Sequence, residues 1–143
     1  MLREQERAIE WDCITALTCF YDLYDRWDYE GMVAFFSPDG LWHRAGKKLM
    51  GREAIMAELR LRPITQKVRH VLSNLLVDVV DERHTLLRGY LTVYRHEGCA
   101  ADDSEVLIHA PSLLLRVTAE FERTSNAWLI SNQVMRRDFI FPA

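Results

Sequence analysis

The stretch of sequence that decides the fold is Asp25–Gly40, which reads DRWDYEGMVAFFSPDG. Asp28 can accept hydrogen bonds from the backbone that follows it, so it predicts the start of a short helix with Met32, Phe35 and Phe36 on its buried side. The last four residues, SPDG, are typical of a tight turn after a helix. The stretch therefore predicts a junction at which one helix ends, a second follows and the chain then turns into a strand.

The residues before this junction follow a helical period. Their apolar side chains recur at steps of three and four, which defines one stripe along a helix of about residues 3–27. The stripe consists of Ile9, Cys13, Leu17, Phe20, Tyr24 and Trp27. After the junction, two short strands are expected at 41–45 and 48–50. A third helix is expected from Gly51 to Pro63, because proline cannot continue a helix.

After Pro63 the sequence becomes rich in residues that favour strands. Long strands are expected at 68–80, 85–94, 106–122 and 127–141, separated by polar turns or a loop. Pro111, within the third of them, predicts a bulge or a sheet edge, because proline lacks the N–H that a central strand donates. Helices followed by a long antiparallel meander indicate an α+β domain. Its bent sheet would wrap around one helix and leave a concave mouth for a small ligand.

The composition fits one globular domain over residues 1–143. Hydrophobic residues make up 49% and charged residues 27% of the chain. The net charge of −3 and the scattered basic residues argue against nucleic acid and anionic membranes as partners. No stretch has the pattern of a signal peptide or a membrane span, so a cytoplasmic location is expected. Cys13, Cys19 and Cys99 have no metal or redox spacing and are expected to be free thiols.

Three segments of the chain resemble the NTF2-like superfamily, and its SnoaL-like branch in particular. They are the 25–40 stretch, the helix start Gly51–Ile55 (GREAI) and the strand segment Arg69–Asn74 (RHVLSN). They occur in the family's order and span most of the chain. The resemblance implies a cone-shaped α+β fold, in which three N-terminal helices pack on a strongly bent, mixed but mainly antiparallel β-sheet. It implies less about function, because this scaffold hosts dehydratases, isomerases, cyclases and non-catalytic subunits.

Two polar residues are the part of the resemblance that implies a catalytic role. Asp25 and His70 are similar in position to an Asp–His dyad that moves protons during water elimination in scytalone dehydratase and bile-acid 7α-dehydratase. Other polar residues of those enzymes are not matched. Leu115 and Val117 replace polar side chains of the first enzyme, and Phe20 stands where the second has a tyrosine. The resemblance thus implies the dyad without the rest of either active site.

The residues themselves also give Asp25 a reason to meet His70. A carboxylate near the C-terminal end of a helix is destabilised by the helix dipole and needs a partner. If His70 is that partner, Asp25 holds its imidazole in one tautomer, and the other ring nitrogen is free to take and return a proton. An equally simple alternative is that Asp25 forms a salt bridge or caps a neighbouring loop.

Further side chains are candidates for contacts with a ligand. Trp42 and Arg44 share one face of the first strand, and Asn74 shares a face with the dyad histidine on a later strand. Tyr24 and Trp27 lie on the apolar stripe of the first helix. Each has a structural alternative, which is a core position for the aromatic side chains, solvent for Arg44 and a backbone contact for Asn74.

The sequence leaves two functions open. One is a cofactor-independent lyase (dehydratase) or isomerase acting on a small apolar, aromatic or polycyclic molecule. The other is a non-catalytic module that binds a small molecule or serves as an assembly subunit, as the β-subunits of ring-hydroxylating dioxygenases do. No metal or cofactor is expected, because the histidines are far apart in sequence and no phosphate-binding or nucleophile motif is present. A homodimer through the outer sheet face is expected in either case, because helices cover only one side of its apolar strands.

Overall fold

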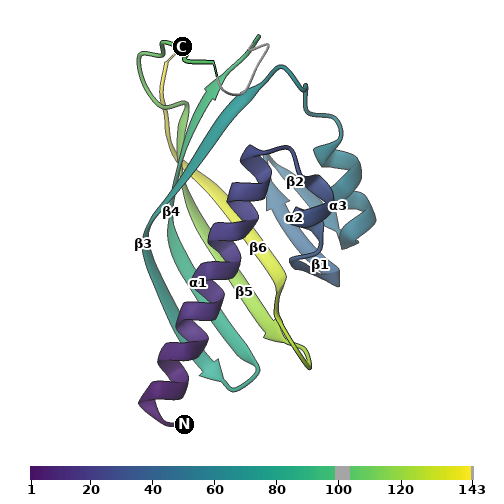
Figure 1. Cartoon of the computed structure of the whole chain (residues 1–143), viewed down its shortest axis with the longest axis vertical. Coiled ribbons are helices and arrows are strands. Elements are labelled where there is room, and N and C mark those ends of the chain that lie inside the picture. Colours follow the sequence, from purple (N-terminus) through teal and green to yellow (C-terminus); the bar gives the residue numbers. More distant parts are fainter. Residues whose placement is uncertain (99–103, 143) are drawn as a thin grey trace.

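A long helix lies across one face of a mixed β-sheet in the computed structural model of the chain (Figure 1), which describes residues 1–98 and 104–142. Within these residues the helices are α1 (Arg3–Asp25), α2 (Tyr29–Val33) and α3 (Gly51–Leu59). The strands are β1 (Phe36–Arg44), β2 (Lys47–Met50), β3 (Lys67–Asp81), β4 (His84–His96), β5 (Leu113–Arg123) and β6 (Trp128–Ile140). The α+β architecture expected from the sequence is confirmed.

The strands form one open sheet in the order β2-β1-β6-β5-β4-β3. All neighbouring strands are antiparallel except β1 and β6, which run parallel. The sheet is therefore mixed but mainly antiparallel, as expected. We call the face that packs against α1 the inner face and the opposite one the outer face. Because side chains alternate along a strand, each position of β3 to β6 can be assigned to one of the two faces.

The core lies between α1 and the inner face. The apolar stripe of α1 is buried from Ile9 to Tyr24, as its spacing predicts. Phe20 packs edge-to-face on Phe36 and Trp42, with ring centroids 5.6 and 5.4 Å away. This cluster ties the middle of α1 to β1 and so fixes where the end of the helix meets the sheet.

The junction after α1 differs from its expected form in two ways. The helix ends at Asp25, not near Trp27, because Trp27 adopts a left-handed backbone conformation with φ of 59°. The SPDG segment does not leave the sheet as a turn. It lies inside β1, where the pairing with β6 slips between Phe36 and Leu41. Pro38 has no N–H for regular strand pairing, and the slip removes the need for one. The segment whose sequence predicts a turn therefore forms an irregular part of a strand.

The third long strand also begins later than expected. It starts at Leu113, not at residue 106, and Pro111 lies before the strand and makes no bulge in it. The first backbone bond to β4 comes just after the proline, where the Ser112 N–H donates to the Val93 carbonyl at 2.7 Å. Pairing starts only there because Pro111 itself has no N–H to donate.

Two smaller expectations concern single features of the chain. Cys13 and Cys19 are free thiols, and Cys99 lies outside the described residues. The described residues include no helix that is both long enough and apolar enough to cross a membrane.

Candidate active site

The structure brings Asp25 and His70 together at the end of α1. The Asp25 Oδ1 and His70 Nδ1 atoms are 2.6 Å apart, and the backbone N–H of His70 donates to Asp25 Oδ2 at 3.2 Å. The His70 side chain is 4% exposed and that of Asp25 14% exposed. Both oxygens of one carboxylate thus hold one residue of β3, which fixes the orientation of the imidazole.

The contacts of His70 decide which ring nitrogen carries the proton. A carboxylate can only accept hydrogen bonds, so the tautomer that fits Asp25 has its proton on Nδ1 and leaves Nε2 unprotonated. Burial lowers the pKa of His70 from its ordinary value, the hydrogen bond that His70 donates to Asp25 opposes this shift, and the positive charges of Arg62 and Arg95 add to it. The net lowering favours a neutral ring at neutral pH.

Tyr24 lies beside the dyad and is flanked by charged and aromatic groups. Its ring centroid is 4.4 Å from that of His70, and the Arg62 guanidinium carbon lies 4.2 Å from the same centroid. Its hydroxyl oxygen accepts a hydrogen bond from Arg44 Nη2 at 2.9 Å. The hydroxyl proton is then free to donate to an oxygen of a bound molecule.

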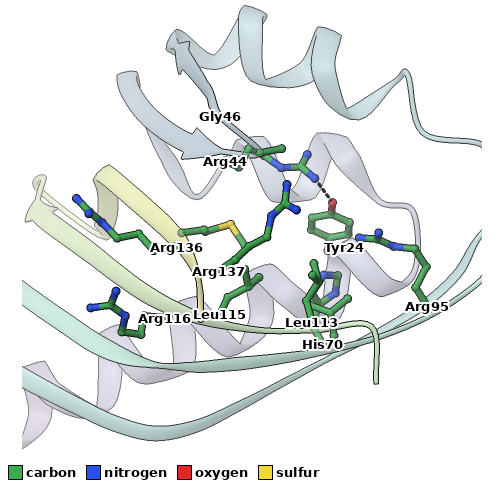
Figure 2. Close-up of a pocket in the computed structure, with 13 residues that line it drawn as sticks. Tyr24, Arg44, Gly46, His70, Arg95, Leu113, Leu115, Arg116, Arg136 and Arg137 are labelled. Carbon is green, nitrogen blue, oxygen red and sulfur yellow. Dashed lines mark hydrogen bonds between the residues drawn. The ribbon is translucent and has the colours of Figure 1, made fainter. Parts of the chain in front are cut away.

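A cavity of about 620 Å³ opens next to Tyr24 and His70. It is partly open to solvent, and its size is within the usual range for small-molecule sites. Figure 2 shows the labelled side chains around it, with His70 next to Leu113 and Tyr24. The apolar part of the lining is formed by Val93, Leu113, Leu115 and Met135. The cavity thus combines an apolar wall with the imidazole and the tyrosine hydroxyl.

Of the other side chains expected at the cavity, only Arg44 lines it. Trp42 is fully buried behind the lining, where its indole N–H contacts the Met135 sulfur at 3.1 Å and its ring packs on Arg44. Trp27 is half-buried outside the lining. Asn74 is exposed in a hollow of the outer face. A bulge of β3, where Asn74 has a φ of 55°, removes it from the face that His70 occupies.

Sequence reasoning missed Arg95 and Arg137, whose side chains also line the cavity. Alternation along the strands could have found them. Arg95 follows buried Val93 at the next inward position of β4, and Arg137 follows Met135 in the same way on β6. The expected apolar and aromatic cavity therefore has a cationic mouth. Among the described residues, no cluster of His, Cys, Asp or Glu suited to a metal ion is found.

Comparison with known protein families identifies the group to which this architecture belongs. The family model of the SnoaL-like domain matches residues 6–134. The chain belongs to the SnoaL-like family. The resemblance of the 25–40, 51–55 and 69–74 segments to the SnoaL-like branch of the NTF2-like superfamily is confirmed.

Solved structures agree with this assignment. A protein named as a candidate scytalone dehydratase from Novosphingobium aromaticivorans DSM 12444 has a TM-score of 0.84 and 14% identity, over 99% of this chain and 92% of that one. ActVI-ORFA from Streptomyces coelicolor has a TM-score of 0.77 and 14% identity, over 92% and 98%. A Catenulispora acidiphila protein in complex with S-DNPA has a TM-score of 0.75 and 19% identity, over 92% and 95%. No curated protein matches the sequence. At these identities the similarity shows the NTF2-like fold alone.

Proposed function

We propose that this SnoaL-like protein binds a small organic molecule in the cavity beside Tyr24 and acts on it as a cofactor-independent dehydratase or isomerase. The observation that carries the proposal is the 2.6 Å contact of Asp25 with His70 Nδ1, between two largely buried side chains, one of which lines the cavity. Ligand binding is further supported by the structural neighbour from Catenulispora acidiphila, which was crystallised in complex with S-DNPA.

The proposed elimination needs a ligand with a hydrogen on the carbon next to a carbonyl and a hydroxyl on the following carbon. The unprotonated Nε2 of His70 takes the proton from the carbon, and the electron pair of the broken C–H bond moves toward the carbonyl to form an enolate. The enolate then forms the carbon–carbon double bond as the C–O bond breaks. The imidazolium returns its proton to the departing oxygen, which leaves as water. An isomerase would return the proton to a different carbon.

Three residues have distinct parts in this scheme. His70 carries the proton, and Asp25 is a positioning residue that fixes the tautomer and stabilises the imidazolium. Tyr24 donates a hydrogen bond from its hydroxyl to the enolate oxygen and keeps its proton. Arg44 strengthens that donor through its hydrogen bond to the tyrosine oxygen, because a positive charge nearby stabilises developing negative charge.

Hydrogen–deuterium exchange of 2-tetralone in D₂O tests the chemistry without knowledge of the natural substrate. Exchange at the carbon next to the carbonyl, followed by proton NMR, reports removal of a proton to give an enolate. We expect the wild type to exchange this probe faster than buffer does. His70→Asn should reduce the enzyme-dependent rate by roughly 10²-fold or more, the usual contribution of a general base.

A surface pair provides the matched control for this experiment. His84 Nδ1 lies 2.9 Å from Asp81 Oδ1, and both side chains are exposed. His84→Asn removes the same kind of pair away from the cavity and should leave the exchange rate unchanged. If His70→Asn exchanged 2-tetralone as fast as the wild type, the dyad would have no part in proton removal.

The second candidate function is a non-catalytic binding module, and the partly open mouth of the cavity favours it. In that case the wild type binds small molecules in the cavity but exchanges 2-tetralone no faster than buffer. We also propose, as part of the functional state, a homodimer formed through the outer sheet face. Its test belongs to the whole molecule and is argued in the Discussion.

A further inference from the structure

Arginines from separate strands meet at the mouth of the cavity. Alternation turns Arg44 of β1, Arg95 of β4 and Arg137 of β6 to the inner face of the sheet. Figure 2 shows their side chains directed toward the space next to Tyr24 and His70, and all three line the same cavity. Arg116 and Arg136 also belong to the lining, so five positive charges face one partly enclosed volume.

Arg44, Arg95 and Arg137 lack the acidic partners that other arginines of the sheet have. Arg116, which lines both this cavity and a hollow of the outer face, lies 2.9 Å from Asp138, and Arg88 lies 3.7 Å from Asp78. No carboxylate in residues 1–98 and 104–142 forms an ion pair with Arg44, Arg95 or Arg137. Like charges that face one volume repel one another, and an anion between them removes this repulsion, although solvent screens part of it at the exposed Arg95 and Arg137.

Neighbouring groups respond to the same positive potential. Burial is the main cause of the lowered pKa of Arg62, and the charges of Arg44 and Arg95 lower it further. Arg95 also contributes to the lowered pKa of His70. The positive field of the mouth thus reaches the dyad, and an anion placed there would act on both.

We propose that Arg95 and Arg137, with Arg44 beside them, bind the anionic group of an organic acid whose apolar, ring-containing body lies deeper in the cavity. A guanidinium forms two parallel hydrogen bonds to a carboxylate, which sets the orientation of the group as well as its affinity. The assignment rests on the proposed function, because it places the same ligand against His70. It names the class of ligand that the dyad receives.

The rest of the cavity fits such a molecule. Val93, Leu113 and Leu115 form an apolar wall next to the arginines. A carboxylate at the mouth then leaves the apolar body of the ligand near the Nε2 atom of His70. The cavity volume of about 620 Å³ leaves room for a molecule of two or more fused rings.

Matched probes separate charge from shape. We would measure binding of 2-naphthoate and its neutral isostere 2-naphthamide to the wild type by isothermal titration calorimetry at low and high salt. We expect 2-naphthoate to bind about tenfold or more tightly than 2-naphthamide at low ionic strength, with the ratio falling as salt screens the arginines. Inorganic phosphate alone should bind more weakly than 2-naphthoate, because it leaves the apolar wall uncovered.

Substitutions test whether the arginines at the cavity mouth cause the preference for 2-naphthoate. Arg95→Gln and Arg137→Gln should each weaken 2-naphthoate binding by about tenfold and leave 2-naphthamide binding unchanged, since each removes one charged hydrogen-bond donor. Arg137→Lys should keep part of the affinity because it keeps the charge but not the bidentate geometry. Arg7→Gln, at an exposed position of α1, is the matched control and should bind both probes like the wild type. Thermal unfolding of each variant establishes that it is folded.

Three results would overturn the anion site: equal affinity of the wild type for the two naphthalene probes, no binding of 2-naphthoate at millimolar concentration, or unchanged 2-naphthoate affinity in both glutamine variants. If phosphate binds as tightly as 2-naphthoate, the proposal that the ligand has an apolar organic body is contradicted. The test does not depend on turnover. If 2-naphthoate binds through the arginines but 2-tetralone does not exchange, the proposed anion site stands and the proposed enzyme function is contradicted. If 2-tetralone exchanges but 2-naphthoate does not bind, the enzyme function is supported and the anion site is contradicted.

Discussion

The imidazole of His70 packs against two tyrosine rings, and this sets how it responds to pH. The ring centroids of Tyr21 and Tyr24 lie 5.1 and 4.4 Å from that of His70. Burial among these rings removes the water that would stabilise a protonated imidazole, and it lowers the pKa of His70 even though Asp25 is hydrogen-bonded to it. The site therefore holds the neutral ring that a general base requires.

This shift predicts a loss of stability in mild acid. Below the ordinary histidine pKa of 6.5, the unfolded chain takes up a proton at His70, whereas the folded protein resists it until a lower pH. The contribution to the free energy of unfolding is present above that value and is lost as the pH falls through the folded pKa. Urea unfolding at about pH 7.5 and about pH 5.5 measures it, and His70→Asn should lose less stability between the two because asparagine does not titrate. An equal loss in both proteins would contradict the lowered pKa.

At the scale of residues, the sequence predicts the parts of the site that have a local reason to be where they are. Asp25 stands at a helix end that disfavours its charge, and this indicates a partner such as His70. Arg95 and Arg137 have no such local reason to face the cavity, and alternation points to them only once the inward positions of β4 and β6 are known. Their face depends on the register of β4 to β6, which long-range pairing sets.

Among the elements, β3 and β4 show how a strand is bent around the core. Between the pairs Ser73–Tyr90 and Leu76–Arg88, Asn74 and Leu75 together oppose the single residue Gly89, so β3 has a bulge at this point. A Cβ atom at Gly89 would meet the Leu75 side chain and would lie 3.0 Å from the Ser73 carbonyl oxygen. Glycine is thus the residue that lets the bulged strand close on β4.

Gly89→Ala should therefore destabilise the protein, although glycine to alanine in a strand usually stabilises it. We expect a loss of about 1 kcal/mol in the free energy of unfolding, as for other overpacked sites. In a Leu75→Ala background the loss should be smaller, because the closest contact has been removed, and the double-mutant cycle gives the coupling. Urea unfolding measures all four proteins. A Gly89→Ala variant more stable than the wild type would contradict this prediction and show that β3 moves away from the added Cβ atom at little cost.

At this scale the sequence predicts the existence and order of elements better than their ends. The apolar stripe of α1, the order of the four long strands and the start of α3 at Gly51 are all found in the structure. The two main shifts of boundary come at prolines, at Pro38 inside β1 and at Pro111 before β5. A proline shows only where regular pairing is interrupted. Whether the chain then turns, bulges or delays its strand depends on the neighbouring strand, which the local sequence does not contain.

On the scale of the whole molecule, α1 covers the inner face and leaves the outer face of the sheet without a covering helix (Figure 1). The outer face carries exposed apolar side chains on β3, β4 and β6, namely Val71, Leu76, Tyr90, Tyr94 and Phe139. Ion pairs lie among them, including Arg116 with Asp138. Apolar side chains spread over neighbouring strands with charged pairs between them are typical of a surface that binds a second protein surface of the same kind.

The homodimer proposed on this basis predicts a change of oligomeric state from one substitution. Tyr90 lies on β4 between Ser73 and Arg116 of the adjacent strands, so it is central to the outer face. A second copy related by a twofold axis would bury it, and Tyr90→Asp would place an unpaired charge in that interface. We expect size-exclusion chromatography with light scattering to give a dimer for the wild type at micromolar concentration and a monomer for Tyr90→Asp. Trp11→Asp, at an exposed aromatic position on α1, should remain a dimer. A monomeric wild type would contradict the proposal, and a Trp11→Asp monomer would place the contact on α1.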